Sequence, residues 1–244
     1  FRKECRSFAE KWIEIHKSQF KRLGVIGDWE NYYSTMSFDA EAQIVRELGK
    51  FLKEGSLYRG FKPVLWSTVE KTALADAEVE YLDHLSNTIY TAFKVKNTDK
   101  QFLKDANIII WTTTPWTIPA NKALAYNSNI DYSLIEIENT DFFDKSKIVV
   151  ATKLLDSFIS SCKIKKFKEL KTFKGDEFNL CLKNNIPSKY TVDDSGRYTK
   201  EIPYFDNLHI FKADKEVIQK LKDEKMLISS DKLQHSYPHS WRSK

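Results

Sequence analysis

The sequence is poor in the residues that covalent or metal-bound frameworks need. Its 244 residues include only 3 cysteines, which are widely spaced and form no CxxC pair. This odd, scattered set argues against a disulfide framework and a cysteine-based zinc site, and it predicts a reducing compartment. Glycine is also scarce, with 7 residues. The segment RLGVIGDW does not have the form of a phosphate-binding loop, so we expect no Walker-type nucleotide site.

Long apolar runs are absent as well. No stretch of about 18 consecutive apolar residues occurs, which argues against a membrane span. The first segment, FRKECRSFAEKW, is helical in pattern and lacks the apolar core of a signal peptide. We therefore expect a cytoplasmic protein with no membrane partner. The sequence also lacks an initiator methionine, which leads us to expect a piece of a longer chain.

The composition is that of a folded globular protein. Hydrophobic residues make up 41% and charged residues 30% of a chain long enough for one large domain or two smaller ones. The net charge is +5 and the isoelectric point is near 8.8. This mild excess of positive charge suits a polyanion such as RNA, but an ordinary lysine-rich surface explains it equally well.

Hydrophobic periodicity predicts helices at both ends of the chain. Residues 1–22 and 213–225 place their apolar side chains along one face. Between residues 37 and 55, Ser37 is a plausible N-cap and Gly55 a plausible C-cap, which predicts another helix.

The middle of the chain is rich in short β-branched runs separated by Asn, Asp and Lys. The runs that we expect to be strands are SLYRGFKPVLWS, NTIYTAFKV, ANIIIWTTT, DYSLIEIE, KIVVATK and MLISSDKLQHSYPHSW, with short helices at TKLLDSFISS and DEFNLCLKNN. This pattern predicts a mixed α/β protein with a β-barrel-like core, flanking helices and short strands. We expect the core at 85–206, with connecting arms at 1–84 and 207–244.

One segment, IIIWTTTPWTIPANKAL at 108–124, concentrates short hydroxyl side chains at the end of an apolar strand. The hydroxyls belong to Thr112, Thr113, Thr114 and Thr117. They can hold a carbonyl, an ester oxygen or a water. Pro115 and Pro119 stiffen the turn, and Asn121 adds an amide. From the residues alone, a strand end closed by a local hydroxyl turn explains the segment as well as a polar pocket wall does.

The segment WTTTPWTIPANKALAYN closely resembles the threonine-rich segment in the editing domain of isoleucyl-tRNA synthetases, and valyl- and leucyl-tRNA synthetases carry related versions. Further segments that resemble the bacterial-type isoleucyl enzymes are RLGVIGDWENYYSTM, LYRGFKPVLWSTVEKTALADAEVEY and QHSYPHSWRSK. The resemblance spans nearly the whole chain in order. It implies that 85–206 is an editing domain inserted in the catalytic domain, and that the two arms lead from and return to that domain.

The resemblance implies hydrolysis of the ester that joins valine to the terminal adenosine of tRNA(Ile). It makes Thr114 a main catalytic participant, and it places these residues in the substrate pocket: Thr112, Thr113, Trp116, Thr117 and Asn121. The chain has no HxGH-like and no KMSKS-like element, so we expect no aminoacyl-adenylate synthesis. We expect no cofactor, and no covalent intermediate because no Ser-His or Cys-His pair is evident.

The carboxylate that orients the substrate ammonium in the family corresponds to Asp176 or Glu177, judged by the distance to the aromatic Phe178. The family's upstream histidine and Ala-Pro, within a few dozen residues, have no counterpart beside Gly175. Either the protein lacks this loop or the sequence leaves it out, and the intact surroundings favour the second. Without the resemblance, the two acids would be an ordinary acidic pair at a helix N-terminus.

Two further acids, Asp193 and Asp194 in VDDSGRY, are second choices for the pocket because the family's chain passes near it there. Adjacent acids make a poor metal site, and a turn closed by Gly196 is the more economical explanation. His235 and His239 are four residues apart, but Pro238 disfavours a helix that would bring them together. Some family members bind zinc with cysteines where serines stand at 240 and 243, and serine is a poor zinc ligand, so we predict no metal.

The basic stretch CKIKKFKELKTFKG could meet tRNA phosphates through Lys165, Lys166 and Lys168. A solvated strand face is an equal alternative. The partners that the resemblance implies are the acceptor end of tRNA(Ile), the valine that it carries, and the rest of a parent synthetase chain. The alternatives that remain are a module that binds the acceptor end without hydrolysis, an inert spacer, and a valyl-type domain that edits threonine.

Overall fold

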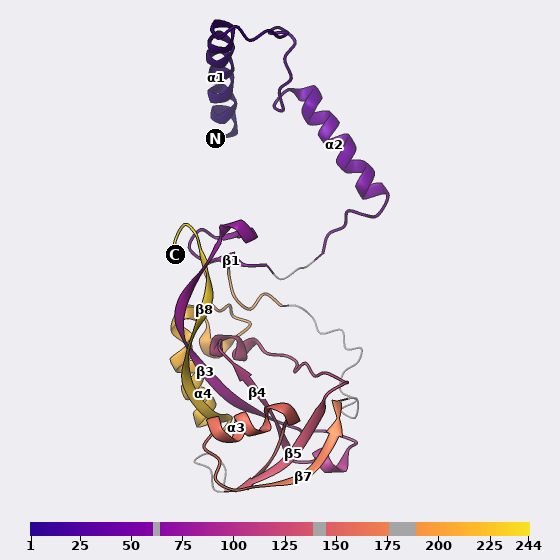
Figure 1. Cartoon of the computed structure of the whole chain (residues 1–244), viewed down its shortest axis with the longest axis vertical. Coiled ribbons are helices and arrows are strands. Elements are labelled where there is room, and N and C mark those ends of the chain that lie inside the picture. The colour runs from indigo at the N-terminus through magenta and orange to yellow at the C-terminus, as the bar shows by residue number, and fades with distance from the viewer. Residues whose placement is uncertain (61–63, 139–144, 176–188) are drawn as a thin grey trace. The chain divides into compact units, whose positions relative to one another are not determined.

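The computed structural model describes residues 1–60, 64–138, 145–175 and 189–244 (Figure 1). The chain divides into two compact units, Phe1–Pro63 and Val64–Lys244, each of which is described by itself. The segments predicted above, 1–84, 85–206 and 207–244, rest on composition and resemblance, and they stay a prediction.

The first unit contains the two predicted helices. α1 spans Arg2–Arg22 and α2 spans Phe38–Lys53. At the start of α2 the Ser37 hydroxyl accepts a hydrogen bond from Ala40 N–H at 3.3 Å, which is the predicted N-cap. Neither helix has a buried residue, so their apolar faces have no core within the described part of this unit.

The second unit is built on one mixed sheet (Figure 1). Its strands are β3 (Val79–Lys94), β4 (Ala106–Thr112), β5 (Asp131–Glu138), β6 (Lys145–Ala151), β7 (Phe167–Lys174) and β8 (Leu227–Ser240). They lie in the order β7-β5-β6-β4-β3-β8, and only the β4–β6 pair is parallel. A small hairpin of β1 (Trp66–Ser67) and β2 (Thr72–Ala73) stands apart from this sheet.

The expected barrel-like closure is not found among the described strands. Closing the sheet would require a ladder between its two edge strands, and neither β7 nor β8 pairs with a described strand on its outer side. The described part is therefore an open mixed sheet with flanking helices, because long-range strand order decides closure and strand patterns do not.

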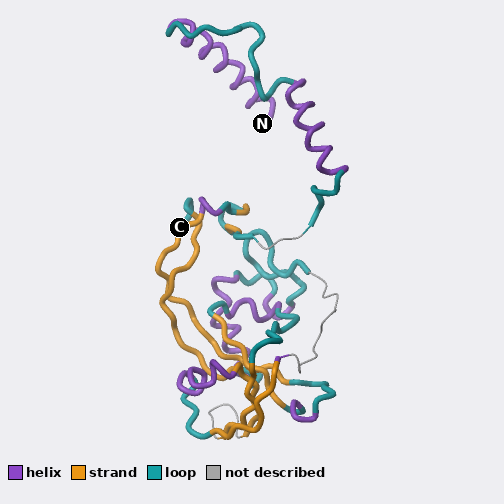
Figure 2. The backbone as a smooth tube through the Cα atoms, turned by 45° about the vertical axis from the view of Figure 1, so that its right-hand side comes forward, coloured by secondary structure: helices purple, strands orange, loops and turns teal. Residues whose placement is uncertain are grey.

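The longest pairing joins β3 to β8 as an antiparallel ribbon (Figure 2). The register runs from Val79 opposite Ser240 to Thr91 opposite Leu227, with an irregularity between Tyr90 and Thr91. Pro238 is accommodated because β8 is an edge strand, where a missing backbone N–H costs little.

Two helices supply the packing partners of the sheet. The buried Phe158 of α3 (Leu155–Ser161) lies in one core cluster with Ile135 and Ile148 of β5 and β6. The helix α4 (Ile210–Asp223) buries Ile210, Ala213, Val217 and Leu221 in a second cluster with Ile89 of β3. α4 begins three residues before the predicted start, because the His209 ring caps it by accepting a hydrogen bond from Phe211 N–H at 3.2 Å.

The remaining element predictions have mixed outcomes. The strands expected in NTIYTAFKV, ANIIIWTTT, DYSLIEIE, KIVVATK and MLISSDKLQHSYPHSW are confirmed, as is the helix in TKLLDSFISS. The strand expected over SLYRGFKPVLWS is wrong for most of its described length, since only Trp66 and Ser67 pair. The helix predicted at DEFNLCLKNN lies outside the described residues. Among the helices that the structure describes, none has the length and apolar character needed to cross a bilayer.

Candidate functional site

The threonine-rich segment forms a tight polar turn directly after β4. Thr112 Oγ1 accepts a hydrogen bond from Thr114 N–H at 3.0 Å and lies 3.1 Å from the Thr114 hydroxyl. In the following 3₁₀ turn, η3 (Pro115–Ala120), Thr117 donates its N–H and its hydroxyl to the Thr114 carbonyl at 3.0 and 2.8 Å. The local hydroxyl turn that the sequence allowed is therefore present.

The turn is held to its surroundings at one residue, Trp116, through its backbone N–H and its carbonyl. Trp116 N–H donates to Asp214 Oδ1 at 3.2 Å, and the Trp116 carbonyl accepts a hydrogen bond from the Tyr198 hydroxyl. Tyr198 is buried, and Asp214 is the fifth residue of α4. Buried Pro115 stiffens the same stretch. The strand end is thus held from a helix and from a loop that are distant in sequence.

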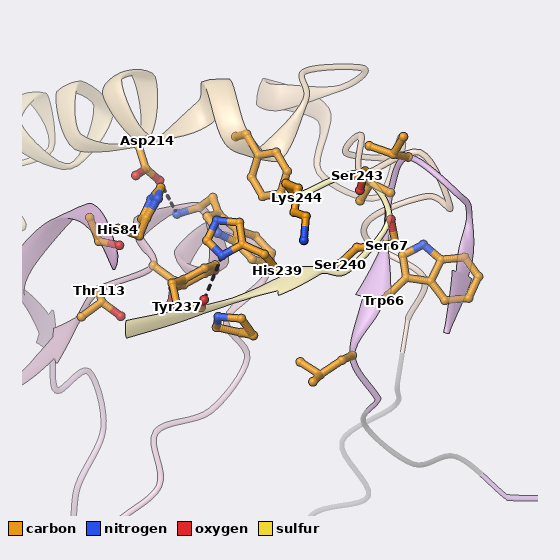
Figure 3. A pocket seen from close by; sticks show the side chains of 18 of the residues that line it. Trp66, Ser67, His84, Thr113, Asp214, Tyr237, His239, Ser240, Ser243 and Lys244 are labelled. Carbon is orange, nitrogen blue, oxygen red and sulfur yellow. Dashed lines mark hydrogen bonds between the residues drawn. The ribbon is translucent and has the colours of Figure 1, made fainter. Parts of the chain in front are cut away.

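The turn lines a cavity of about 790 Å³ (Figure 3). Besides an apolar wall, the cavity has many polar lining residues, among them Thr113, Thr114, Trp116, His84, Ser86, Asn87, Asp214, Tyr237 and His239. Three lysines, Lys212, Lys215 and Lys244, line it as well. In Figure 3 Asp214 and His84 lie close together, with Thr113 and Tyr237 below them. The cavity therefore combines hydroxyls, imidazoles, ammonium groups and a carboxylate, and the threonine-rich turn forms part of its polar wall.

The electrostatics of the cavity are set by partial burial. Burial raises the pKa of Asp214 above its ordinary value, against the lowering effect of hydrogen bonds from Asn87 and Trp116. Burial, with the charge of Asp214, also raises the pKa of the Tyr237 phenol. The His84 ring lies 5.1 Å from the Tyr237 ring and 6.0 Å from the His239 ring, measured between centroids. Such groups can hold a ligand that carries both a cation and an ester oxygen.

One expectation about nucleophiles is wrong in its geometry. Ser86 Oγ lies 2.9 Å from His235 Nε2, so the chain does contain a serine hydrogen-bonded to a histidine. Ser86 lines the cavity. Among the described residues no carboxylate hydrogen-bonds to the other nitrogen of His235, so no third group orients the ring as in a triad. The absence of a covalent intermediate stays a prediction.

The structure does not bring all the predicted pocket residues to the cavity. Thr113, Thr114 and Trp116 line it, and Thr112 supports them from the turn. Thr117 and Asn121 are exposed and do not line it.

The predicted acids fall in two places. Asp193 accepts hydrogen bonds from Ser195 and Arg197 N–H, both at 2.9 Å, and Gly196 with φ of 75° closes the predicted turn. The neighbouring Asp194 carbonyl accepts from the indole of Trp66, a cavity-lining residue, at 3.0 Å. The turn therefore lies beside the cavity without lining it. Asp176 and Glu177 lie outside the described residues.

The lysines proposed for tRNA are exposed and stand elsewhere. Lys165 and Lys166 immediately precede β7, and Lys168 lies on it, at an edge of the sheet. None of them lines the cavity. A role in binding tRNA stays a prediction.

Among the described residues, no group of three or more His, Cys, Asp or Glu side chains could hold a metal ion. The positions discussed for zinc instead form a hydrogen-bonded cluster. The hydroxyls of Ser67, Ser240 and Ser243 all donate to Glu70 Oε2, the last two at 3.2 and 3.4 Å. These bonds, that from Ser67 foremost, lower the pKa of Glu70. Hydroxyls and one carboxylate thus join the β1–β2 hairpin to the end of β8.

Sequence reasoning missed Asp214, His84 and Tyr198. Asp214 lies near the start of the helix predicted at 213–225, where an acid is routine, so it carried no signal. Tyr198 and His84 belong to no recognisable sequence motif. They come near the threonine-rich turn only in the folded chain, where α4 packs against η3 and β3.

Comparison with known proteins places the chain in a family. The chain matches the family described as tRNA synthetases class I (I, L, M and V) over residues 1–233. The isoleucine–tRNA ligase of Pelagibacter ubique (strain HTCC1062) is 59% identical over 290 positions, which cover 100% of this chain and 32% of that protein. The isoleucine–tRNA ligases of Francisella tularensis subsp. novicida (strain U112) and Rhodopseudomonas palustris (strain ATCC BAA-98 / CGA009) are 39% and 36% identical, over 100% of this chain and 31% of each protein.

The chain spans about a third of the length of the curated relatives it matches. The alignments run over 290, 294 and 312 positions, more than the 244 residues of the chain, so the relatives carry residues without a counterpart here. With the family match covering nearly the whole sequence, the chain belongs to the class I tRNA synthetases of the isoleucine, leucine, methionine and valine group.

Proposed function

We propose that the chain is the proofreading part of an isoleucine–tRNA ligase and hydrolyses the aminoacyl ester of mischarged valyl-tRNA(Ile). One observation carries the proposal. The threonine-rich turn opens onto a cavity of about 790 Å³, in a chain whose curated relatives are isoleucine–tRNA ligases.

The size of the cavity suits such a substrate. Small-molecule sites generally occupy roughly 300–1,000 Å³, and the cavity lies within this range. A second site is useful because one methylene is worth only about 1–3 kcal/mol of discrimination, for which isoleucine against valine is the established example. If a second pocket admits valine and rejects isoleucine by size, the overall discrimination is the product of the selection at the synthetic site and the selection at this pocket.

The proposed chemistry is a single hydrolytic step. A water oxygen attacks the carbonyl carbon of the ester, the bond to the ribose oxygen breaks, and that oxygen leaves with a proton as the adenosine hydroxyl. Thr113 and Thr114 present hydroxyls to hold the ester and the water. The carboxylate at Asp176 or Glu177 binds the α-ammonium, which orients the ester for attack. Trp116 supplies part of the cavity wall.

The direct test is release of labelled valine from Val-tRNA(Ile), with Ile-tRNA(Ile) in parallel. We expect release of valine and sparing of isoleucine, and we expect Thr114→Ala to slow the release about tenfold or more. Thr98→Ala is the matched control, because the Thr98 hydroxyl also closes a local turn, accepting from Lys100 N–H at 3.1 Å, and does not line the cavity. Release from both tRNAs would refute the size selection.

A second candidate, binding of the acceptor end without hydrolysis, is favoured by the length of the alignments. If the residues that the relatives carry in excess include part of the hydrolytic site, this chain retains the cavity and loses the reaction. The same assay separates the two functions, because a binding module retains affinity for Val-tRNA(Ile) and releases no valine. A threonine-editing site of the valyl type would release threonine from Thr-tRNA(Val) instead.

The proposed partners are the acceptor end of tRNA(Ile) and the rest of a ligase chain in the cytoplasm. If Lys165, Lys166 and Lys168 contact phosphates, replacing all three by Gln should weaken tRNA binding and flatten its salt dependence. Unchanged salt dependence would assign them to the solvated strand face.

A further inference from the structure

Asp214 is a half-buried carboxylate that the hydrolytic scheme above does not use. Among the described residues that line the cavity, it is the only acid. Both of its oxygens are engaged, Oδ1 by Trp116 N–H at 3.2 Å and Oδ2 by the Asn87 amide at 3.1 Å. The carboxylate therefore bridges α4, the threonine-rich turn and β3.

This bridge acts at Trp116, two residues after the cavity-lining Thr114. Thr114 is the N-cap of η3, and Trp116 is the second residue of that turn. The Trp116 N–H is held by Asp214 and its carbonyl by Tyr198, so Trp116 is fixed from both of its backbone polar groups. Fixing this point limits how far the cavity-lining Thr113 and Thr114 can move from the cavity.

A carboxylate is suited to this position because it offers an acceptor oxygen to each of two donors. An Asn side chain at 214 has one acceptor oxygen, so its NH₂ group would face the NH₂ group of Asn87. An alanine would leave both donors without partners, and a buried unpaired donor is costly.

We propose that Asp214 is a positioning residue for the hydrolysis, which holds the Thr113–Thr114 hydroxyls toward the cavity by bridging Trp116 N–H and the Asn87 side chain. The expected effect of Asp214 on hydrolysis rests on the proposed function. Its role in holding the turn rests on the hydrogen bonds alone. Asp214 acts through the turn and does not touch the reacting atoms.

The experiment compares the full chain with Asp214→Ala, Asp214→Asn and the exchanged pair Asp214→Asn with Asn87→Asp. Asp223→Asn is the matched control, because Asp223 is the exposed last residue of the same helix. Two quantities are measured: amide hydrogen exchange in the peptide that contains Trp116, and kcat and KM for valine release from Val-tRNA(Ile). Circular dichroism checks that each variant is folded.

In Asp214→Ala we expect exchange at Trp116 to accelerate about tenfold as one hydrogen bond is lost. We expect kcat to fall about tenfold to a hundredfold with KM little changed, because misplaced groups cost mainly the chemical step. The exchanged pair restores an acceptor for each donor, so it should recover protection and kcat relative to Asp214→Asn alone.

Two results would overturn the inference: exchange in Asp214→Ala as slow as in Asp223→Asn, or faster exchange with unchanged kcat. A wild-type chain that releases no valine would overturn the proposed function and, with it, the catalytic meaning of Asp214. The exchange measurement would then still decide whether Asp214 holds the turn, so the two failures are distinguishable.

Discussion

Replacement of Gly175 by alanine tests a close approach of two backbone segments in the second unit. Gly175 follows β7, and its N–H donates to the Ile130 carbonyl at 3.0 Å. A Cβ at this position would lie 1.9 Å from the Asn127 carbonyl oxygen and 2.8 Å from its carbonyl carbon. The nearest atoms all belong to the backbone of Asn127 and Ser128, so no side-chain rotation can relieve the clash.

The magnitude follows from this geometry. Ordinary contact begins near 3.4 Å, so the two segments must separate by about 1.5 Å. Overpacking of this kind costs about 1–3 kcal/mol, and movement of Gly175 also weakens its hydrogen bond to Ile130, worth about 1 kcal/mol. We therefore expect Gly175→Ala to lower the free energy of unfolding by about 2–4 kcal/mol.

The assay is urea unfolding of the full chain, with hydrogen exchange of β5 and β7 peptides to assign the loss to this unit. Lys174→Ala is the control, because its ion pair with Asp131, at 2.8 Å, is exposed and should contribute less than about 1 kcal/mol. If Gly175→Ala shifts the midpoint no more than Lys174→Ala, the close approach is not a constraint and the reasoning is refuted.

Three further outcomes are expected. Phe158→Ala should lower the free energy of unfolding in urea by about 3–5 kcal/mol, because the Phe158 ring is fully buried. The control Leu154→Ala, at a side chain that is 60% exposed, should change it little. Equal losses in the two variants would contradict the assignment of Phe158 to the core. Serine hydroxyls lower the pKa of Glu70, so wild type should be more stable than Glu70→Gln above pH 4.5. This advantage should disappear as the pH falls through the pKa that Glu70 has in the folded protein. A difference in melting temperature that does not depend on pH would contradict this expectation. Burial raises the pKa of Cys162 to about 12, so iodoacetamide at about pH 8 should label Cys5 and spare Cys162 in peptide mapping, and native labelling of Cys162 would show that the thiol is not buried.

Local features of the fold were predictable because their signals are local. The Ser37 cap and the apolar spacing define α2 without any tertiary information. The β-branched runs mark β4, β5 and β6 correctly. The predicted closure of the sheet is not found among the described strands. Closure depends on which strands become edges, and the pairing of β8 with β3 joins segments more than 130 residues apart.

The candidate site shows the same division. The hydroxyls of Thr113 and Thr114 could be predicted, since they cluster in one segment that also carries the family resemblance. Asp214 could not, because its role arises only when α4 packs against η3. The assignment of Asp176 and Glu177 lies outside the described residues, so it stays a prediction.

The β3–β8 ribbon has a mechanical consequence. In an antiparallel ladder the hydrogen bonds run across the strands, and Val79 and Ser240 are neighbours at one end of this one. A force that draws these two residues apart loads the first pair of bonds alone and then passes to the next, as in a zipper. Pulled between these points, the unit should open progressively at low force, whereas traction along the strands would load many bonds together and resist far more.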